Sequence, residues 1–210
     1  MRPLVFLVAD KNMEFVLRGF FFGRQQWHRI LGCALFDFKE NDIVRAVGQN
    51  DPGLFARASE LLLPIRNRYR HAVVMIDADW GGSPGSAKIQ KKMEDHFSNA
   101  GWHSENSLVL VHEPEIENWI WSDSPHTSSA MGWENWEQLR EALETNQWLE
   151  PGSMKPSRPK EAAEWALRKK RIPRSSALYK KITAHISVNR CQDRAFRTLR
   201  ETLKRWFPPG

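Results

Sequence analysis

The stretch AVVMIDADWGGSPG at residues 72–85 decides the fold and raises the question of function. Residues 72–76 are apolar on both faces, which predicts a strand buried in a parallel sheet that is covered by helices. Asp77 and Asp79 follow, and residues two apart in an extended chain point to the same side. Two carboxylates that close, at the end of a strand where ligands bind, need a cation, a proton or water between them.

Apolar runs of strand length alternate with helical repeats through residues 1–125. Strands are predicted at residues 3–9, 29–38 and 72–76 and from residue 107, with helices at 12–22, 51–70 and 86–102 and after Pro114. This alternation favours a doubly wound α/β fold, a parallel sheet with helices on both faces. Beyond residue 125 the periodicity is helical only, with helices predicted at 133–146, 158–171, 175–186 and 192–207. We therefore expect an α/β domain at 1–125 and a basic, helical C-terminal region at 126–210.

The charges of the chain are unevenly divided. Residues 1–154 contain 15 basic and 21 acidic residues, a net charge of −6, whereas residues 155–210 contain 16 basic and 4 acidic residues, a net charge of +12. A protein that holds a metal in one part and a polyanion in the other would show this division. A solvated basic face explains the charge alone equally well.

Cysteine usage and apolar run lengths exclude several classes of protein. The two cysteines, Cys33 and Cys191, are far apart in sequence, which argues against a disulfide framework and a zinc site. The apolar run before Asp10 is too short for a secretory signal, and no run reaches the length of a membrane span. We expect a cytoplasmic protein with no membrane partner.

Acidic residues follow three of the predicted strands, as the pairs Asp10 with Glu14, Asp77 with Asp79, and Glu113 with Glu117. Parallel strands end at one edge of a sheet, so these groups are expected to converge. Glu113 and Glu117 are four residues apart and should share a helix face, with Glu115 turned away. Carboxylates without a histidine or cysteine cluster suit Mg²⁺ or Mn²⁺, which support phosphoryl transfer. Taken singly, each acid also fits a helix cap or a turn residue.

The segment GGSPG matches the Gly-x-Ser-x-Gly pattern of a hydrolase nucleophile, with Ser83 as the nucleophile. The residue after that serine must donate a backbone N–H to the oxyanion hole, and Pro84 has none. Ser83 also lies several residues beyond the strand end. Both features count against a hydrolase of this type.

The segment MIDADWGG resembles the DxD motif of Toprim domains, the metal-binding α/β module of topoisomerases, primases and OLD-type nucleases. The resemblance covers about residues 1–125 and implies that Asp77 and Asp79 bind metal. Toprim proteins carry a glutamate after the first strand, often as the general acid or base. This chain has Asp10 and then Glu14, which leaves open which of them fills that role. We assign Asp10 to the metal, and Glu14 and Glu117 to catalysis.

Four further segments resemble a small family associated with methylation-linked phage-defence systems. They are VADKNMEFVLRGFF at 8–21, EPEIENWIWSDSPH at 113–126, RPKEAAEWALRKKRIPRSSALY at 158–179 and RCQDRAFRTLRETL at 190–203. This resemblance covers nearly the whole chain and implies a role in bacterial antiviral defence, with other subunits of such a system as partners. It does not indicate a reaction.

A dense basic segment is predicted to bind nucleic acid through Arg168, Lys169, Lys170, Arg171, Arg174, Lys180 and Lys181. Cations at the end of a helix also favour its dipole, which is the structural alternative. Of the ten tryptophans, Trp80 is the candidate for ligand contact, because it lies between the aspartates and the glycines.

Two hypotheses of different classes follow from these observations. The first is a Mg²⁺-dependent phosphoryl-transfer protein, a nuclease of bacterial defence. The second is a non-catalytic module that binds nucleic acid or a partner subunit with its basic helices. Nucleotide handling uses the same acids as strand cleavage, and the sequence does not separate the two.

Overall fold

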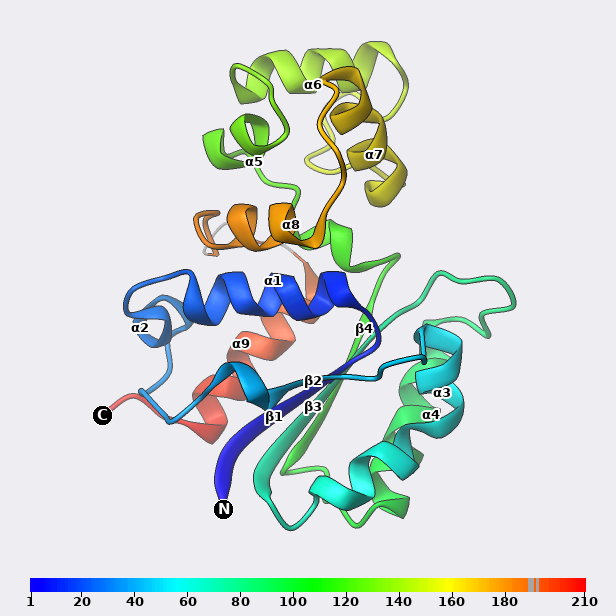
Figure 1. The fold of residues 1–210 in the computed structure, drawn as a ribbon, viewed down its shortest axis with the longest axis vertical. Helices are drawn as coiled ribbons and strands as arrows, with labels where there is room; N and C mark the ends of the chain where they lie inside the picture. Colours follow the sequence, from blue (N-terminus) through cyan, green and yellow to red (C-terminus); the bar gives the residue numbers. More distant parts are fainter. Residues whose placement is uncertain (189–190, 192) are drawn as a thin grey trace.

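The computed structural model describes residues 1–188, 191 and 193–210 (Figure 1). Its strands are β1 (Arg2–Val8), β2 (Ile43–Arg45), β3 (Tyr69–Asp77) and β4 (Ser107–His112). Its α-helices are α1 (Lys11–Phe22), α2 (Trp27–Leu31), α3 (Asp51–Leu62), α4 (Ser86–Asn99), α5 (Pro125–Ala130), α6 (Trp136–Thr145), α7 (Pro159–Lys169), α8 (Ser176–Thr183) and α9 (Arg194–Trp206). Short 3-10 helices are η1 (Glu40–Asp42), η2 (Leu63–Ile65) and η3 (Ile116–Trp119).

The strands that the structure describes form one parallel sheet with the order β2-β1-β3-β4. Phe6 of β1 pairs with Val73 of β3, and Asp77 at the end of β3 pairs with His112 at the end of β4. The inner strands β1 and β3 are buried on both faces, which explains their continuous apolar sequences. The predicted α/β class is confirmed, and the topology is Rossmann- or Toprim-like.

The strand predicted at residues 29–38 is wrong. Residues 27–31 form α2, and the second strand is the short β2 at Ile43–Arg45. The aromatic residues that suggested a strand instead pack as a cluster without a backbone ladder. Phe38 contacts Phe6 and Phe21, and Phe36 stacks on Phe207 with 3.9 Å between ring centroids.

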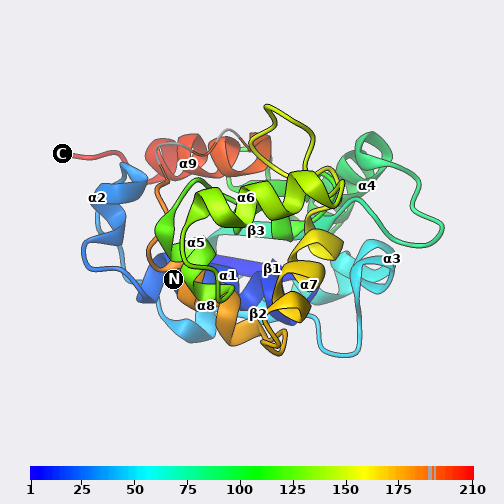
Figure 2. The same cartoon turned by 90° about the horizontal axis from the view of Figure 1, so that it is seen from above.

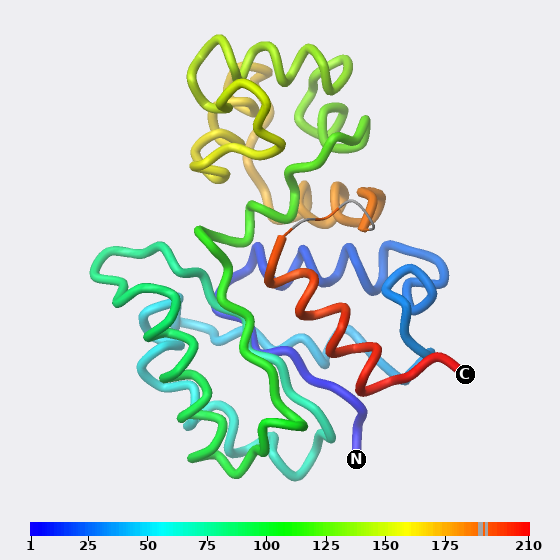
Figure 3. The backbone as a smooth tube through the Cα atoms, turned by 180° about the vertical axis from the view of Figure 1, so that it is seen from behind, coloured from blue at the N-terminus to red at the C-terminus, as the bar shows by residue number. Residues whose placement is uncertain are grey.

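Helices cover both faces of the sheet. The pair α3 and α4 lies on one face, and α1 and α9 lie on the other (Figures 1 and 3). Helix α8 packs on α1, while α5, α6 and α7 form a lobe beyond the carboxyl edge of the strands (Figures 1 and 2). The helix predicted at 192–207 appears as α9, although its first predicted residue, Gln192, lies outside the described residues. Of the predicted C-terminal helices, α9 therefore contributes to the layer over the sheet, whereas α8 packs on the outer side of α1.

Helix α1 begins at the carboxyl edge of the sheet, directly after β1. The side chain of Asp10 accepts the N–H of Met13 at 2.8 Å, an N-cap that starts the helix directly after the strand. A Cβ atom at Gly19 would lie 1.9 Å from Thr183 Oγ1 and 2.6 Å from the carbonyl oxygen of Lys180. Glycine at this position therefore allows α8 to approach α1 closely.

Among the described residues, no helix is both long enough and apolar enough to cross a membrane.

Candidate metal centre

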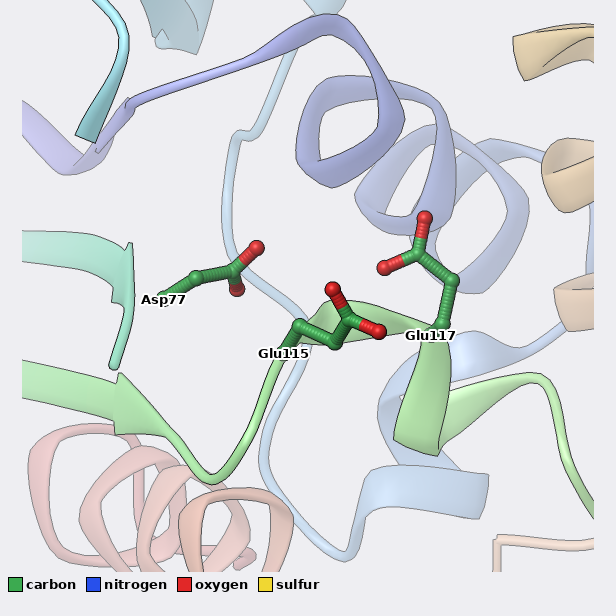
Figure 4. A group of neighbouring side chains, drawn as sticks. All are labelled: Asp77, Glu115 and Glu117. Carbon is green, nitrogen blue, oxygen red and sulfur yellow. The ribbon is translucent and has the colours of Figure 1, made fainter. Parts of the chain in front are cut away.

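A buried acidic triad, Asp77, Glu115 and Glu117, lies at the carboxyl edge of the sheet (Figure 4). Asp77 ends β3, Glu115 directly precedes η3, and Glu117 lies within η3. One carboxylate oxygen from each residue lies within 4.8 Å of the others. The three residues are only 7%, 6% and 2% exposed, in chain order. The ends of two neighbouring strands thus bring three carboxyl groups together away from water.

A cavity of about 430 Å³ opens beside the triad. Asp77 and Glu117 line it together with Asp10, Asp51, Asp79, Trp80, Lys160 and Arg174. Its volume is within the range of small-molecule sites. The cavity therefore joins acidic, basic and aromatic side chains in one place.

Asp77 is fixed by two hydrogen bonds. Its Oδ1 accepts the N–H of Ile116 at 2.9 Å, and its own backbone N–H donates to Oδ1 of Asp51 at 2.8 Å. Burial raises the pKa of Asp77 well above its ordinary value, and the negative charges of Asp51 and Glu117 raise it further. Burial likewise raises the pKa of Asp51 to about 6. The positive charge near the Asp77 and Asp51 side chains is therefore too small to offset the cost of burying their charged forms.

Glu117 has a different environment, because three donors converge on its Oε1. They are Asn12 Nδ2 at 3.1 Å, Arg174 Nη2 at 2.8 Å and the Tyr179 hydroxyl at 2.9 Å. Arg174 also bonds Glu164 and the Tyr179 oxygen, so it bridges α7, α8 and η3. Burial, followed by the charge of Glu117, raises the pKa of Tyr179, which keeps its hydroxyl proton in place. Arg174 is thus the counter-ion of the Glu117 carboxylate within the fold.

Glu115 lies against the first turn of α7. Its Oε1 accepts the backbone N–H of Lys160 at 2.9 Å, and the Lys160 ammonium lies 3.9 Å from Oε2. This N–H is one of the donors that a helix N-terminus leaves without an intrahelical partner. Burial and then the charge of Glu117 nevertheless raise the pKa of Glu115 to about 7.

Carboxyl groups outnumber cations around the cavity. Six of them gather there, namely Asp10, Asp51, Asp77, Asp79, Glu115 and Glu117, beside the two cations Lys160 and Arg174. Among the described residues, no histidine or cysteine joins the group of candidate ligands. Oxygen ligands and excess negative charge fit a hard divalent cation such as Mg²⁺ or Mn²⁺. The triad could therefore hold a metal ion.

The structure brings together some of the acids predicted from sequence but not all. Asp10 lines the cavity while it also caps α1, and the exposed Asp79 lies at the cavity wall. Glu14 does not line the cavity, because its carboxylate pairs with Arg18 at 2.9 Å and Arg45 at 3.1 Å.

The expectation that Glu113 and Glu117 share a helix face, with Glu115 turned away, is wrong. The helical turn begins only at Ile116, and Glu115 is still extended, with φ −157° and ψ 167°. Glu115 therefore joins the triad. Glu113 is exposed and lines a different cavity, of about 780 Å³, between α4, β4 and α9.

Asp51 also lines the cavity, although it was not predicted from the sequence as a site residue. Asp51 is the first residue of α3, which follows β2, so it too comes after a strand that ends at this edge. The misplaced second strand hid this relation. The available signal was the one that identified Asp10, an acid at the start of the helix that follows a strand.

The seven basic residues predicted to bind nucleic acid do not form one patch. Arg174 points into the acidic cavity, where it pairs with Glu117. Arg168, Lys169, Lys170 and Arg171 are exposed at the far end of α7. Lys180 and Lys181 lie in the last turn of α8.

Ser83 shows no nucleophile geometry. Its hydroxyl donates to the carbonyl of Ala78 at 2.5 Å and accepts the N–H of Gly85 at 3.2 Å. The hydroxyl therefore shapes its own loop.

Comparisons with models of protein families, with curated proteins and with solved structures gave no significant match to this chain. The topology of the sheet and the geometry of the acidic cavity are therefore the observations that bear on function.

Proposed function

We propose that this chain is a Mg²⁺-dependent phosphoryl-transfer protein and that it acts as a nuclease. The observation that carries the proposal is the buried triad of Asp77, Glu115 and Glu117 beside a cavity that also contains Lys160 and Arg174. The setting in bacterial antiviral defence, with other subunits as partners, rests on the sequence resemblance alone.

In this proposal the triad holds the metal, with Asp10, Asp51 and Asp79 within the same cavity. A bound divalent cation would activate a nucleophile and offset charge on a phosphate group. Lys160 and Arg174 face the same space, where their charges would orient a phosphate. Asn12 and Tyr179 fix the position of the Glu117 carboxylate. Because Asn12, Arg174 and Tyr179 together hold one oxygen of Glu117 in place, we assign Glu117 to metal binding instead of proton transfer.

One observation favours the second candidate, a non-catalytic binding module. Toprim-like enzymes place a general acid or base after the first strand, yet here Asp10 caps α1 and Glu14 pairs with two arginines. A site without that group would retain metal binding and lose turnover. The two candidates therefore differ in cleavage and agree in metal affinity.

A calorimetric Mn²⁺ titration at pH 8 tests the metal centre. The wild type should bind Mn²⁺, and Asp77→Asn should weaken binding at least 100-fold while its amide still accepts the Ile116 N–H. The exposed Asp95 on α4 supplies the matched control, because Asp95→Asn makes the same chemical change far from the triad. Equal Mn²⁺ affinity in the wild type and in Asp77→Asn would contradict the proposal.

Cleavage then separates the two candidates. Labelled single-stranded DNA and RNA are incubated with the wild type and Mg²⁺, and with Asp77→Asn as the inactive control. Metal-dependent cleavage that the variant lacks would support the nuclease. Metal binding without cleavage of either polymer would favour the binding module.

A further inference from the structure

Helix α7 joins the acidic cavity to a basic surface. At its first turn, Lys160 donates its backbone N–H to Glu115 and lines the cavity. Its last residue, Lys169, lies nine residues further, roughly 14 Å at 1.5 Å per residue. In Figure 1, α7 runs from the carboxyl edge of the sheet up to α6. The helix therefore spans the distance between the acidic cavity and its own basic end.

The far end of α7 carries four consecutive exposed cations, Arg168, Lys169, Lys170 and Arg171. None of the four forms an ion pair with another described residue. By contrast, the two arginines that flank α7 in the sequence are paired with glutamates of that helix, Arg158 with Glu161 and Arg174 with Glu164. The four charges are therefore available to a polyanion.

Three tryptophans lie beside these cations. Trp165 of α7 stacks near Trp133 and Trp148, with ring centroids 6.2 Å and 6.4 Å away. Lys170 Nζ lies 4.3 Å from the ring centroid of Trp133, and Lys169 Nζ lies 5.6 Å from that of Trp165. Trp148 and Trp165 are half-buried, so each residue remains partly exposed, and the Arg158 guanidinium lies 5.6 Å from the ring centroid of Trp148. We call Arg168 to Arg171 with Trp148 and Trp165 the tryptophan–cation surface.

We propose that the tryptophan–cation surface binds single-stranded nucleic acid and leads the strand along α7 into the acidic cavity. Cations contact the phosphates, and accessible aromatic rings stack on unpaired bases, a combination that suits a single strand. A duplex keeps its bases stacked inside, and a cavity of about 430 Å³ with a buried triad admits a nucleotide of a flexible strand more readily than a duplex. Delivery of the strand to the acidic cavity rests on the proposed function, whereas binding of the strand to the tryptophan–cation surface does not.

Fluorescence anisotropy of the full chain in EDTA tests the binding step without metal. The probes are a labelled mixed-sequence 20-nucleotide single strand, the same sequence as a duplex, an abasic strand of equal charge, and a poly-glutamate peptide. The variant is Lys169→Gln/Lys170→Gln, and the control is Lys88→Gln/Lys91→Gln, which removes two exposed lysines from α4.

The wild type should bind the single strand at least tenfold more tightly than the duplex and at least fivefold more tightly than the abasic strand. Lys169→Gln/Lys170→Gln should weaken binding at least tenfold and lower the slope of log affinity against log salt by about 1.4, whereas the control keeps both. Equal affinity of that variant and the wild type would overturn the inference. Tighter binding of the duplex, or equally tight binding of poly-glutamate, would also overturn it.

Failure here is distinct from failure of the proposed function. A wild type that binds no Mn²⁺ but still binds the strand in EDTA would overturn the metal centre and leave the surface standing. Mn²⁺ binding with no anisotropy change would overturn the surface alone.

Discussion

The acidic cavity and the far end of α7 hold their charges in opposite ways. In the cavity, Glu117 is 2% exposed and depends on Arg174, Tyr179 and Asn12 for partners. At the end of α7, Lys169 and Lys170 are exposed and lie over the rings of Trp165 and Trp133, and neither forms an ion pair with a residue that the structure describes. A buried charge must be matched by the fold, whereas an exposed one needs no partner. The cavity is therefore a built site whose parts depend on one another, and the surface is a set of independent charges.

Removal of one cation from each region tests this contrast most strongly. Arg174→Gln leaves the Glu117 carboxylate buried without its counter-ion, and we expect a loss of about 3 kcal/mol in the free energy of unfolding. Arg168→Gln removes the same charge at the exposed end of α7 and should change stability by less than about 0.5 kcal/mol. Urea denaturation at pH 7 measures both values. Equal losses in the two variants would mean that the cavity is no more interdependent than the surface.

The cavity should also give the protein an unusual dependence on pH. The folded chain keeps a proton on Glu115 up to a pKa of about 7, whereas the unfolded chain loses it near 4.5. Between these values the folded state binds more protons, so stability falls as pH rises from about 4.5 to 7 and stays lower above that range. The difference corresponds to about 3 kcal/mol for Glu115, and the raised pKa values of Asp51 and Asp77 act in the same direction.

Urea denaturation of the wild type at pH 5 and pH 8 measures this loss, and Glu115→Gln should remove most of the Glu115 share. Glu141→Gln, at an exposed position of α6, is the control and should keep the wild-type slope. Added Mn²⁺ should restore stability at pH 8 more than at pH 5, because a metal competes with protons for the carboxylates. An equal slope in Glu115→Gln and the wild type would remove Glu115 from the explanation.

Helix packing offers a way to disturb the cavity from outside it. Gly19→Ala would place a methyl group 1.9 Å from Thr183 Oγ1 and force α8 away from α1. We expect a loss of about 2 kcal/mol, together with weaker Mn²⁺ binding, because α8 carries Tyr179 to Glu117. Gly81→Ala, where a Cβ meets no atom within 4 Å, should change neither quantity. Thermal unfolding and calorimetry measure the two effects, and unchanged Mn²⁺ affinity in Gly19→Ala would separate α8 from the site.

The sequence predicted the parts of the fold that depend on local pattern. Strands β1 and β3 are continuous apolar runs because both of their faces are covered, and such runs are visible without a structure. Strand β2 has only three residues and exists because it pairs with β1. Phe36 and Phe38 gave a stronger local signal than β2 and belong to an aromatic cluster instead. The pattern of a short segment carries no information about its pairing with a distant strand, and for this reason β2 was not predicted.

The same distinction applies to the candidate site. Asp77 was predictable because it ends a buried strand. Glu115 was not, because its direction depends on where the chain after β4 becomes helical. Arg174 was predicted as part of a basic segment, yet the packing of α8 on α1 carries it into the acidic cavity. Acids that follow strands are recognisable in sequence, whereas the cations that face them come from elements distant along the chain.

The smallest effect is expected within residues 77–79, where a buried acidic residue and an exposed one lie two positions apart. Asp77 is 7% exposed and accepts a hydrogen bond from Ile116, whereas Asp79 is exposed. Asp79→Asn should therefore change the free energy of unfolding by less than about 0.5 kcal/mol and weaken Mn²⁺ binding only a few-fold, in contrast to the large loss in Asp77→Asn. Calorimetry of the two variants side by side measures this difference. An equally large loss in Asp79→Asn would mean that the exposed carboxylate also ligates the metal, and that the site extends from the buried triad to the cavity wall.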